Sequence, residues 1–208
     1  MTGAPVTDYL IRTDAALETL FGPVGEASLR KEVDFLHPVY RRWIEASPFA
    51  VMATAGARGL DASPRGDPAP LVRVPDGKTL LLPERRGNNR ADSLRNLIAD
   101  PRIALLFFVP GIGETLRVNG RATISVDPDL LQMFALGNAR PKCVLVVTVE
   151  AVYFQCARAM LRSDLWRTTA DLSAVPTAGQ MLAALTQDEV GGEQYDQALP
   201  ARQRATLY

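Results

Sequence analysis

The sequence has few of the side chains that metal binding and nucleophilic catalysis require. Its 208 residues include one histidine, His37, and two cysteines, Cys143 and Cys156. Together these fall short of the four ligands of a structural zinc site, and two cysteines make no disulfide framework. A nucleophile needs an adjacent base, but His37 is expected at a helix junction, where a structural or capping role is favoured. We therefore expect no metal site, and we expect Cys156, which follows the apolar run AVYF, to be a core thiol.

No charge of one sign dominates, and no long hydrophobic run is present. Lysine plus arginine equals aspartate plus glutamate at 23 each, so no overall field draws the chain to nucleic acid or to an anionic membrane. The runs IALLFFV and VLVVTV are far shorter than the roughly 20 residues of a membrane-spanning helix. The start MTGAPVTDYL lacks the basic and apolar regions of a secretory signal. These absences predict a soluble, cytoplasmic protein with no nucleic-acid or membrane partner.

Two familiar nucleotide-binding motifs are also missing. Gly111 and Gly113 begin a string like GxGxxG, but Leu116 stands where the third glycine should be, and a strand is expected next. A dinucleotide-binding turn must lead from a strand into a helix, so this interpretation is disfavoured. No GxxxxGK phosphate loop occurs in the sequence either.

Turn residues and hydrophobic periodicity divide the chain into three parts. Residues 1–46 predict an extension of short helices, among them TDAALETLF and a helix opened by Pro38. Residues 47–166 read mainly as strands. Residues 167–208 are more polar, with one candidate helix, AGQMLAALT, and an end that either embraces another subunit or stays loose.

The strands of the middle part are joined mostly by short turns, such as GARG and Asp76-Gly77. A short helix capped by Asp127 is expected in DPDLLQMFAL. The pattern lacks the regular alternation of strands and helices of a parallel sheet. It favours a mainly β fold, an antiparallel barrel of about seven strands with short peripheral helices. The expected strands are FAVMATAG, GLDAS, LVRV, TLLL, RIALLFFV, TLRVNGRATI and VLVVTVEAVYF.

The stretch RRGNNRADSLRN, residues 85–96, contains four arginines and three asparagines. A helix is expected to begin at Asn88–Arg90, with Leu94, Leu97 and Ile98 on one buried stripe. Unpaired N–H groups at a helix start favour a bound anion, and arginine adds a forked donor suited to phosphate oxygens. A solvated turn is the alternative. Because the stretch joins two predicted strands, it should lie at the barrel rim, which favours the anion site.

A second segment, DASPRGDPAP, ends a predicted strand in Ser63-Pro64-Arg65-Gly66. Taken alone, Arg65 fits an ordinary exposed arginine equally well. It lies on the other side of the LVRV and TLLL hairpin from residues 85–96, however, so the two arginine-containing rims could converge on one phosphate.

The order of these motifs resembles the pyridoxamine 5'-phosphate oxidase-like family of FMN-binding split barrels, in a bacterial branch. The resemblance covers residues 47–166. It implies an antiparallel split β-barrel and a homodimer with two FMN sites at the subunit interface. The motifs that carry it are Gly87–Arg90 at a helix start, Asp100-Pro101 at its end, the apolar strand Ile103–Val109, and VNGRA at Val118–Ala122.

The resemblance also implies where the cofactor is held. The phosphate of FMN would lie at the Arg65 segment and at Asn88–Arg90, with the ring along the strands, and Thr115 or Arg117 would reach the flavin or the substrate. No catalytic residue is assigned. The candidate cofactor-binding residues are Ser63, Arg65, Pro83, Asn88, Asn89, Arg90, Ser93, Thr115 and Arg117.

The sequence departs from true pyridoxamine 5'-phosphate oxidases in two places. Gly-Asp-Pro follows Arg65 in place of the family's longer Arg-x-x-x-x-Lys pattern, and the ending ARQRATLY lacks the C-terminal Trp with a distal Arg-Leu. We therefore expect an FMN-dependent oxidoreductase for another small molecule, with NADH or NADPH as candidate electron donor. The alternative is a flavin-binding redox carrier or sensor without turnover. A deazaflavin or heme could replace FMN, although axial ligands for heme are scarce.

Overall fold

The structure, a computed structural model, describes residues 9–57, 59–167 and 172–208. The chain divides into two compact units, Met1–Glu32 and Val33–Tyr208. The first unit contains α1 (Asp14–Phe21) and α2 (Glu26–Arg30). Helix α1 is the helix predicted from TDAALETLF, and the side chain of Thr13 caps it by accepting a hydrogen bond of 3.2 Å from the Ala16 N–H.

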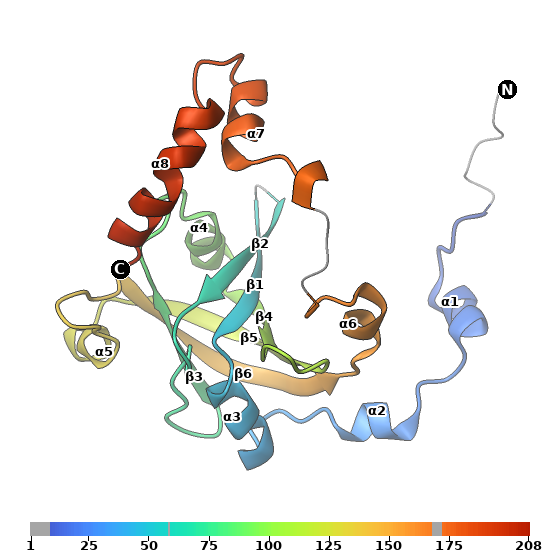
Figure 1. The fold of residues 1–208 in the computed structure, drawn as a ribbon. Helices are drawn as coiled ribbons and strands as arrows, with labels where there is room; N and C mark the ends of the chain where they lie inside the picture. The colour runs from blue at the N-terminus through green and yellow to red at the C-terminus, as the bar shows by residue number, and fades with distance from the viewer. Residues whose placement is uncertain (1–8, 58, 168–171) are drawn as a thin grey trace, which may run out of the picture. The chain divides into compact units, whose positions relative to one another are not determined.

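The second unit is built on one antiparallel sheet of six strands, in the order β2-β1-β4-β5-β6-β3. The sheet curls into a half-barrel (Figure 1), which confirms the predicted split-barrel fold. Strands β2 and β3 end the order, so each pairs with a single neighbour. The strands are β1 (Phe49–Gly56), β2 (Gly59–Gly66), β3 (Thr79–Glu84), β4 (Arg102–Phe108), β5 (Thr115–Ser125) and β6 (Cys143–Gln155).

Strand β4 has apolar side chains on both faces of the sheet. Ile103, Leu105 and Phe107 point into the barrel and are buried, as the alternation of side chains along a strand requires. On the opposite face, Leu106 and Phe108 are apolar and only partly buried. Strand β4 lies between β1 and β5 in the sheet, and its outer face is only partly buried in the single chain.

The predicted LVRV strand is not formed as a strand. Arg73 makes one isolated bridge to Leu81, with backbone hydrogen bonds of 3.0 and 2.9 Å. Leu71, Val72 and Val74 are nevertheless buried in the core. Their hydrophobicity therefore reflects a loop that packs into the barrel, and the nearby prolines, which lack an N–H, prevent a longer ladder.

Two short helices of the second unit begin where the sequence predicted. Helix α3 (Pro38–Glu45) opens at Pro38, and His37 caps it by accepting a hydrogen bond at Nδ1 from the Val39 N–H, 3.3 Å away. Helix α5 (Pro128–Met133) is capped by Asp127 as predicted. The remaining helices outside the pocket are α6 (Arg158–Ser163), the 3-10 turn η2 (Leu172–Ala174), α7 (Ala178–Leu185), which was predicted, and α8 (Gly192–Ala205), which was not.

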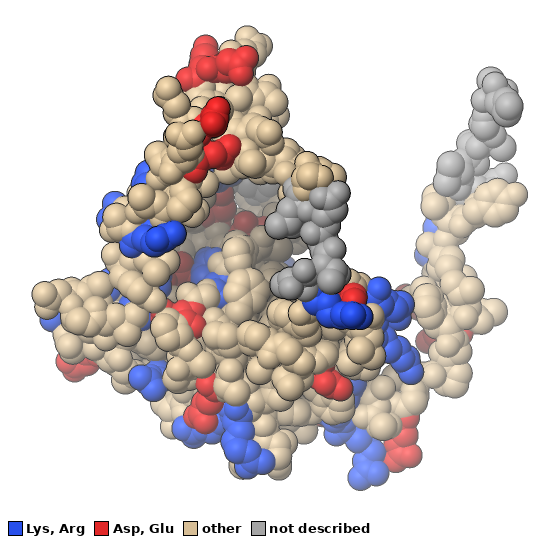
Figure 2. Space-filling model, in the orientation of Figure 1, with Lys and Arg blue, Asp and Glu red and all other residues tan. Residues whose placement is uncertain are grey.

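On the face shown in Figure 2, acidic side chains gather on the tip formed by α7 and α8, whereas acidic and basic side chains are interspersed elsewhere. Within the described ranges, no helix is both long and apolar enough to cross a membrane.

The two cysteines lie in opposite environments, and the prediction that Cys156 is a core thiol is wrong. Cys156 is exposed, because it follows the last residue of β6, where the chain leaves the barrel. Cys143 is buried opposite Glu84 in the β3–β6 ladder. Burial raises the pKa of the Cys143 thiol, and the Glu84 carboxylate adds to that rise.

We expect one thiol of the native protein to react rapidly with a chromogenic disulfide reagent at pH 8. That thiol is Cys156, and Cys143 should react only after unfolding, because it is buried and its pKa is raised. The measurement is the number of chromophores that the reagent releases per protein molecule, in buffer and in denaturant. Cys156→Ser is the control, because it should remove the fast phase of release. Two fast thiols in the native protein would contradict this assignment.

Candidate functional site

The helix after the arginine-rich loop begins later than predicted. Helix α4 spans Asp92–Ala99, and Asn88–Arg90 lie in the loop before it. Asn89 and Ala91 adopt left-handed backbone conformations, with φ of 61° and 54°. A left-handed residue cannot belong to a right-handed helix, so the backbone at Ala91 sets the boundary. The predicted start at Asn88–Arg90 is therefore wrong by a few residues.

The buried face of α4 also differs from the predicted apolar stripe. Leu97 is buried and Leu94 partly so, but Ile98 is 79% exposed. Ser93 and Asn96 are buried in its place. Asn96 donates to Thr54 Oγ1 at 3.2 Å. One face of α4 is therefore partly polar, because Ser93 lines a pocket while Asn96 packs against β1.

Gly56 makes room for the Asn96 amide. A Cβ added to Gly56 would lie 2.3 Å from Asn96 Oδ1, so the polar side of α4 can approach β1 only where β1 has no side chain.

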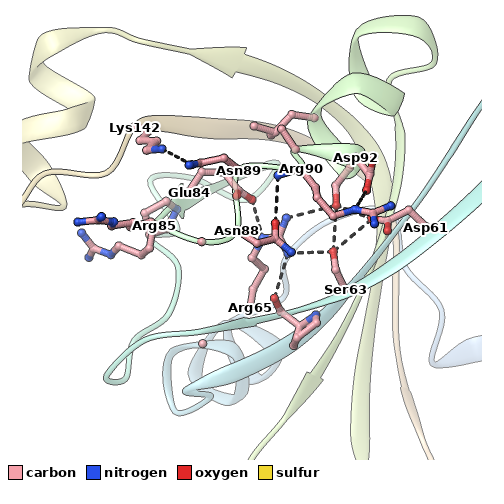
Figure 3. Close-up of a pocket in the computed structure, with 18 of the residues that line it drawn as sticks. Asp61, Ser63, Arg65, Glu84, Arg85, Asn88, Asn89, Arg90, Asp92 and Lys142 are labelled. Atoms are coloured by element: carbon pink, nitrogen blue, oxygen red, sulfur yellow. Dashed lines mark hydrogen bonds and ion pairs between the residues drawn. The ribbon is translucent and has the colours of Figure 1, made fainter. Parts of the chain in front are cut away.

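A network of polar side chains from β2, β3 and α4 forms the floor of the pocket (Figure 3). Arg65 Nε donates to Glu84 Oε1 at 2.6 Å, and its two terminal nitrogens donate to Ser63 Oγ at 2.9 Å and Ser93 Oγ at 3.3 Å. The two serine oxygens lie 2.9 Å apart, and each donates to Asp61. The side chains of Arg65 and Glu84 are only 17% and 12% exposed. The floor is thus a preformed and nearly dry ion-pair network.

A second ion pair borders the same pocket. Arg85 donates to Asp67 Oδ2 from Nε and from a terminal nitrogen, at 2.9 and 2.7 Å, and to the Phe134 carbonyl at 2.7 Å. Arg85 and Asp67 are 13% and 6% exposed. Asp67 Oδ1 is buried and has no hydrogen-bond partner in the described part of the chain. This pair ties the ends of β2 and β3 to the loop after α5.

The rim, in contrast, is exposed and rich in donors. Asn88 accepts from the Arg90 N–H at 3.0 Å, and Arg90 pairs with Asp92 at 2.8 Å while remaining 75% exposed. Lys142, from the loop before β6, donates to Asn89 Oδ1 at 2.6 Å. The pKa of Arg90 is raised, chiefly by its hydrogen bond to Asp92. Its guanidinium therefore stays charged and accessible.

These residues enclose a cavity of about 880 Å³. It brings together seven of the nine residues that the sequence predicted for cofactor binding. Sequence reasoning missed the acidic partners, Arg85 and Lys142, although the acidic residues adjoin arginines in DASPRGD and PERR. The predicted residues at the cavity are Ser63, Arg65, Pro83, Asn88, Asn89, Arg90 and Ser93, and the missed residues include Asp61, Asp67, Glu84, Arg85 and Lys142.

Thr115 and Arg117 lie elsewhere in this single chain. Neither lines the cavity. Thr115 is buried at the start of β5, and Arg117 donates to the Tyr153 hydroxyl at 2.9 Å across the β5–β6 ladder. Among the residues that the structure covers, no cluster of three or more His, Cys, Asp or Glu side chains could hold a metal ion.

With the geometry established, comparisons with known proteins identify the family. The family described as pyridoxamine 5'-phosphate oxidase matches residues 36–156, more than half of the chain and all six strands. The chain belongs to the pyridoxamine 5'-phosphate oxidase family. No protein with a curated description matches the sequence.

Three solved structures illustrate the neighbours of this pyridoxamine 5'-phosphate oxidase family member. A variant of HupZ from Group A Streptococcus has a TM-score of 0.49 and 19% identity, covering 58% of this chain and 99% of that one. The General Stress Protein 26 of Bacillus anthracis has a TM-score of 0.42 and 15% identity, covering 55% and 88%. An FMN-binding protein from Syntrophomonas wolfei has a TM-score of 0.43 and 12% identity, covering 56% and 83%.

Proposed function

We propose that this chain binds FMN in the cavity between β2, β3 and α4 and acts as an FMN-dependent oxidoreductase on a small molecule. The observation that carries the proposal is the cavity itself, where a preformed polar floor meets an exposed, donor-rich rim. Family membership supports a flavin as the ligand.

The residues present fit such a cofactor in size and in chemistry. Ligand pockets usually measure about 300 to 1,000 Å³, and this one measures about 880 Å³. Leu71, Pro83 and Leu94 supply apolar lining for a ring system, while Asn88 and Arg90 supply donors for a phosphate. The left-handed backbone at Asn89 and Ala91 is the kind of conformation that turns neighbouring N–H groups toward an anion.

The two predicted arginines would have different tasks. Every nitrogen of Arg65 already donates within the floor, and Glu84 balances its charge. Arg65 would therefore fix the positions of Ser63 and Ser93. Arg90 is mostly exposed and has one carboxylate partner, so its remaining donors are free to meet a phosphate.

When bound, FMN supplies hydride and electron transfer, and the protein's part is to position the ring and control access to it. This division of labour agrees with the absence of a histidine from the cavity lining. We propose NADH or NADPH as electron donor. A substrate other than pyridoxamine phosphate is favoured, because Gly-Asp-Pro follows Arg65 in place of the pattern typical of that activity.

The deciding experiment is the visible absorption spectrum of the purified protein after incubation with FMN and removal of excess. Flavin bands that persist, with FMN as the compound released on heating, would support the proposal. Rapid bleaching by NADH or NADPH, with reoxidation by an electron acceptor, would support turnover. A protein that takes up no flavin would overturn the assignment.

We expect Arg90→Ala to weaken FMN binding by about 10 to 100 fold. A hydrogen bond to a charged group contributes roughly 1.5 to 3 kcal/mol, which corresponds to that range. The measurement is a fluorescence titration of the flavin. Arg102→Ala is a matched control, since Arg102 is 70% exposed, pairs with an aspartate two residues away and lies outside the cavity. Equal affinities for the two variants would remove Arg90 from the site.

We also propose that the chain is a homodimer. The outer face of the central strands supports this, because the apolar side chains of Val51, Leu106 and Phe108 are only partly buried there. Light scattering should give twice the mass of the 22.6 kDa chain. A monomer at micromolar concentration would refute it.

A further inference from the structure

A second, smaller cavity of about 230 Å³ opens beside the first. It is formed where the end of β3, the loop before β6 and the end of the chain meet. Arg85, Arg86 and Lys142 line both cavities, so a molecule of sufficient length could occupy the two together. Its lining residues are Arg85, Arg86, Ala139, Arg140, Lys142 and Tyr208.

All charged side chains that line this cavity are cationic, and their charge is not balanced locally. Arg85 is neutralised by Asp67. Arg86, Arg140 and Lys142 form no ion pair with any residue in the described ranges, and Lys142 donates only to the neutral amide of Asn89, at 2.6 Å. Three cationic side chains of this cavity therefore have no carboxylate side chain as partner among the described residues, whereas the first cavity pairs its buried arginines with carboxylates.

The kinds of cation present favour one class of ligand. Two arginines offer planar forks that can grip two oxygens at once, and the lysine adds a compact positive charge. Tyr208 covers Arg85, with 5.6 Å between the guanidinium carbon and the ring centre, and so walls one side of the cavity. We propose that this cavity, named here the basic pocket, binds a phosphate or diphosphate group.

Two sources could supply that group. It could belong to a molecule that also reaches the first cavity, such as the diphosphate of a nicotinamide dinucleotide, and this version rests on the proposed function. It could instead be a free oxyanion that binds without any flavin. The basic pocket would recognise both in the same way. The experiment therefore has a first arm that tests whether the pocket binds the group and a second arm that tests which molecule supplies it.

The first arm measures binding of inorganic pyrophosphate by calorimetry to the protein incubated with FMN, and to the same protein without FMN. Arg140→Ala is the test variant, because Arg140 lines the basic pocket but not the larger cavity. We expect its pyrophosphate affinity to fall at least 10-fold while FMN affinity is unchanged. Arg162→Ala removes an exposed arginine of α6 that lies outside both cavities and should bind as the original protein does.

The proposal is overturned if pyrophosphate does not bind in the millimolar range, or if it binds Arg140→Ala and the original protein equally. Because pyrophosphate binding is also measured without flavin, a failure to take up FMN would refute the proposed function and leave this test intact.

The second arm identifies the source by steady-state reduction of the bound flavin. If a dinucleotide brings the diphosphate, Arg140→Ala should raise KM for NADPH about 10-fold and leave KM for reduced nicotinamide mononucleotide nearly unchanged. If pyrophosphate affinity falls but both KM values stay constant, the basic pocket takes a free oxyanion.

Discussion

Replacing Gly120 with alanine should lower the free energy of unfolding by roughly 3 kcal/mol, the upper end of the usual cost of overpacking a core. Gly120 lies in β5, where the pairing with β6 shifts register between Asn119 and Gly120. A Cβ at this position would meet the Thr148 carbonyl oxygen at 2.1 Å. That atom belongs to the backbone of a strand in the middle of the sheet, so it can retreat only by breaking the ladder.

The measurement is urea unfolding of Gly120→Ala, followed by circular dichroism. Gly77→Ala is the matched control, because an added Cβ there meets nothing within 4 Å. The control should differ from the original protein by less than about 0.5 kcal/mol. If the two variants have the same stability, the close approach of β5 and β6 at Gly120 is refuted.

Replacing Arg65 with methionine should cost about 3 kcal/mol or more of stability, for a different reason. The substitution removes the partner of Glu84, whose side chain is only 12% exposed, and leaves a nearly buried carboxylate without its counter-charge. The exposed helical pair Arg41–Glu45 is the comparison, since Arg41→Met should cost less than about 1 kcal/mol.

A double-substitution cycle separates the charge effect from a simple loss of packing. Arg65→Met combined with Glu84→Leu should recover most of the lost stability, because a buried ion pair can often be exchanged for apolar side chains of similar volume. Flavin affinity should not recover, because Ser63 and Ser93 no longer have the donor that fixes them. A double variant as unstable as Arg65→Met alone would contradict the assigned role of the pair.

The features that the sequence predicted well are those determined by neighbours along the chain. Pro38 after His37, and Pro128 after Asp127, specify a helix start within a few residues. The continuous apolar run Ile103–Val109 is likewise a local signal, because it needs only neighbours along the chain to indicate a buried strand. Cap and strand predictions of this kind were confirmed.

The features that it predicted poorly depend on residues that meet only in the folded chain. Asn96 is buried because Gly56 and Thr54 leave room and a partner for it, whereas Ile98 is 79% exposed. The loop residues Leu71 and Val72 were predicted as part of a strand, because a buried loop and a buried strand of a sheet are both hydrophobic in sequence.

The pocket shows the same limit. The arginines of both rims stood out in the sequence, but their partners did not, because an ion pair such as Arg65 with Glu84 joins residues 19 positions apart on two different strands. Helix α8 was missed because Gly191, Gly192 and Pro200 interrupt the pattern that predicts a helix.

The order of the strands shows that the ion pairs of the pocket connect the two outermost strands of the sheet. Strands β2 and β3 are the two outermost strands of the sheet, and no strand pairing joins them to each other. The Arg65–Glu84 and Asp67–Arg85 pairs cross that gap, so side chains close the barrel along the line where the backbone leaves it open. A ligand bound across this gap would hold β2 and β3 together. Amide protons of the two strands should therefore exchange more slowly with solvent once the ligand is bound.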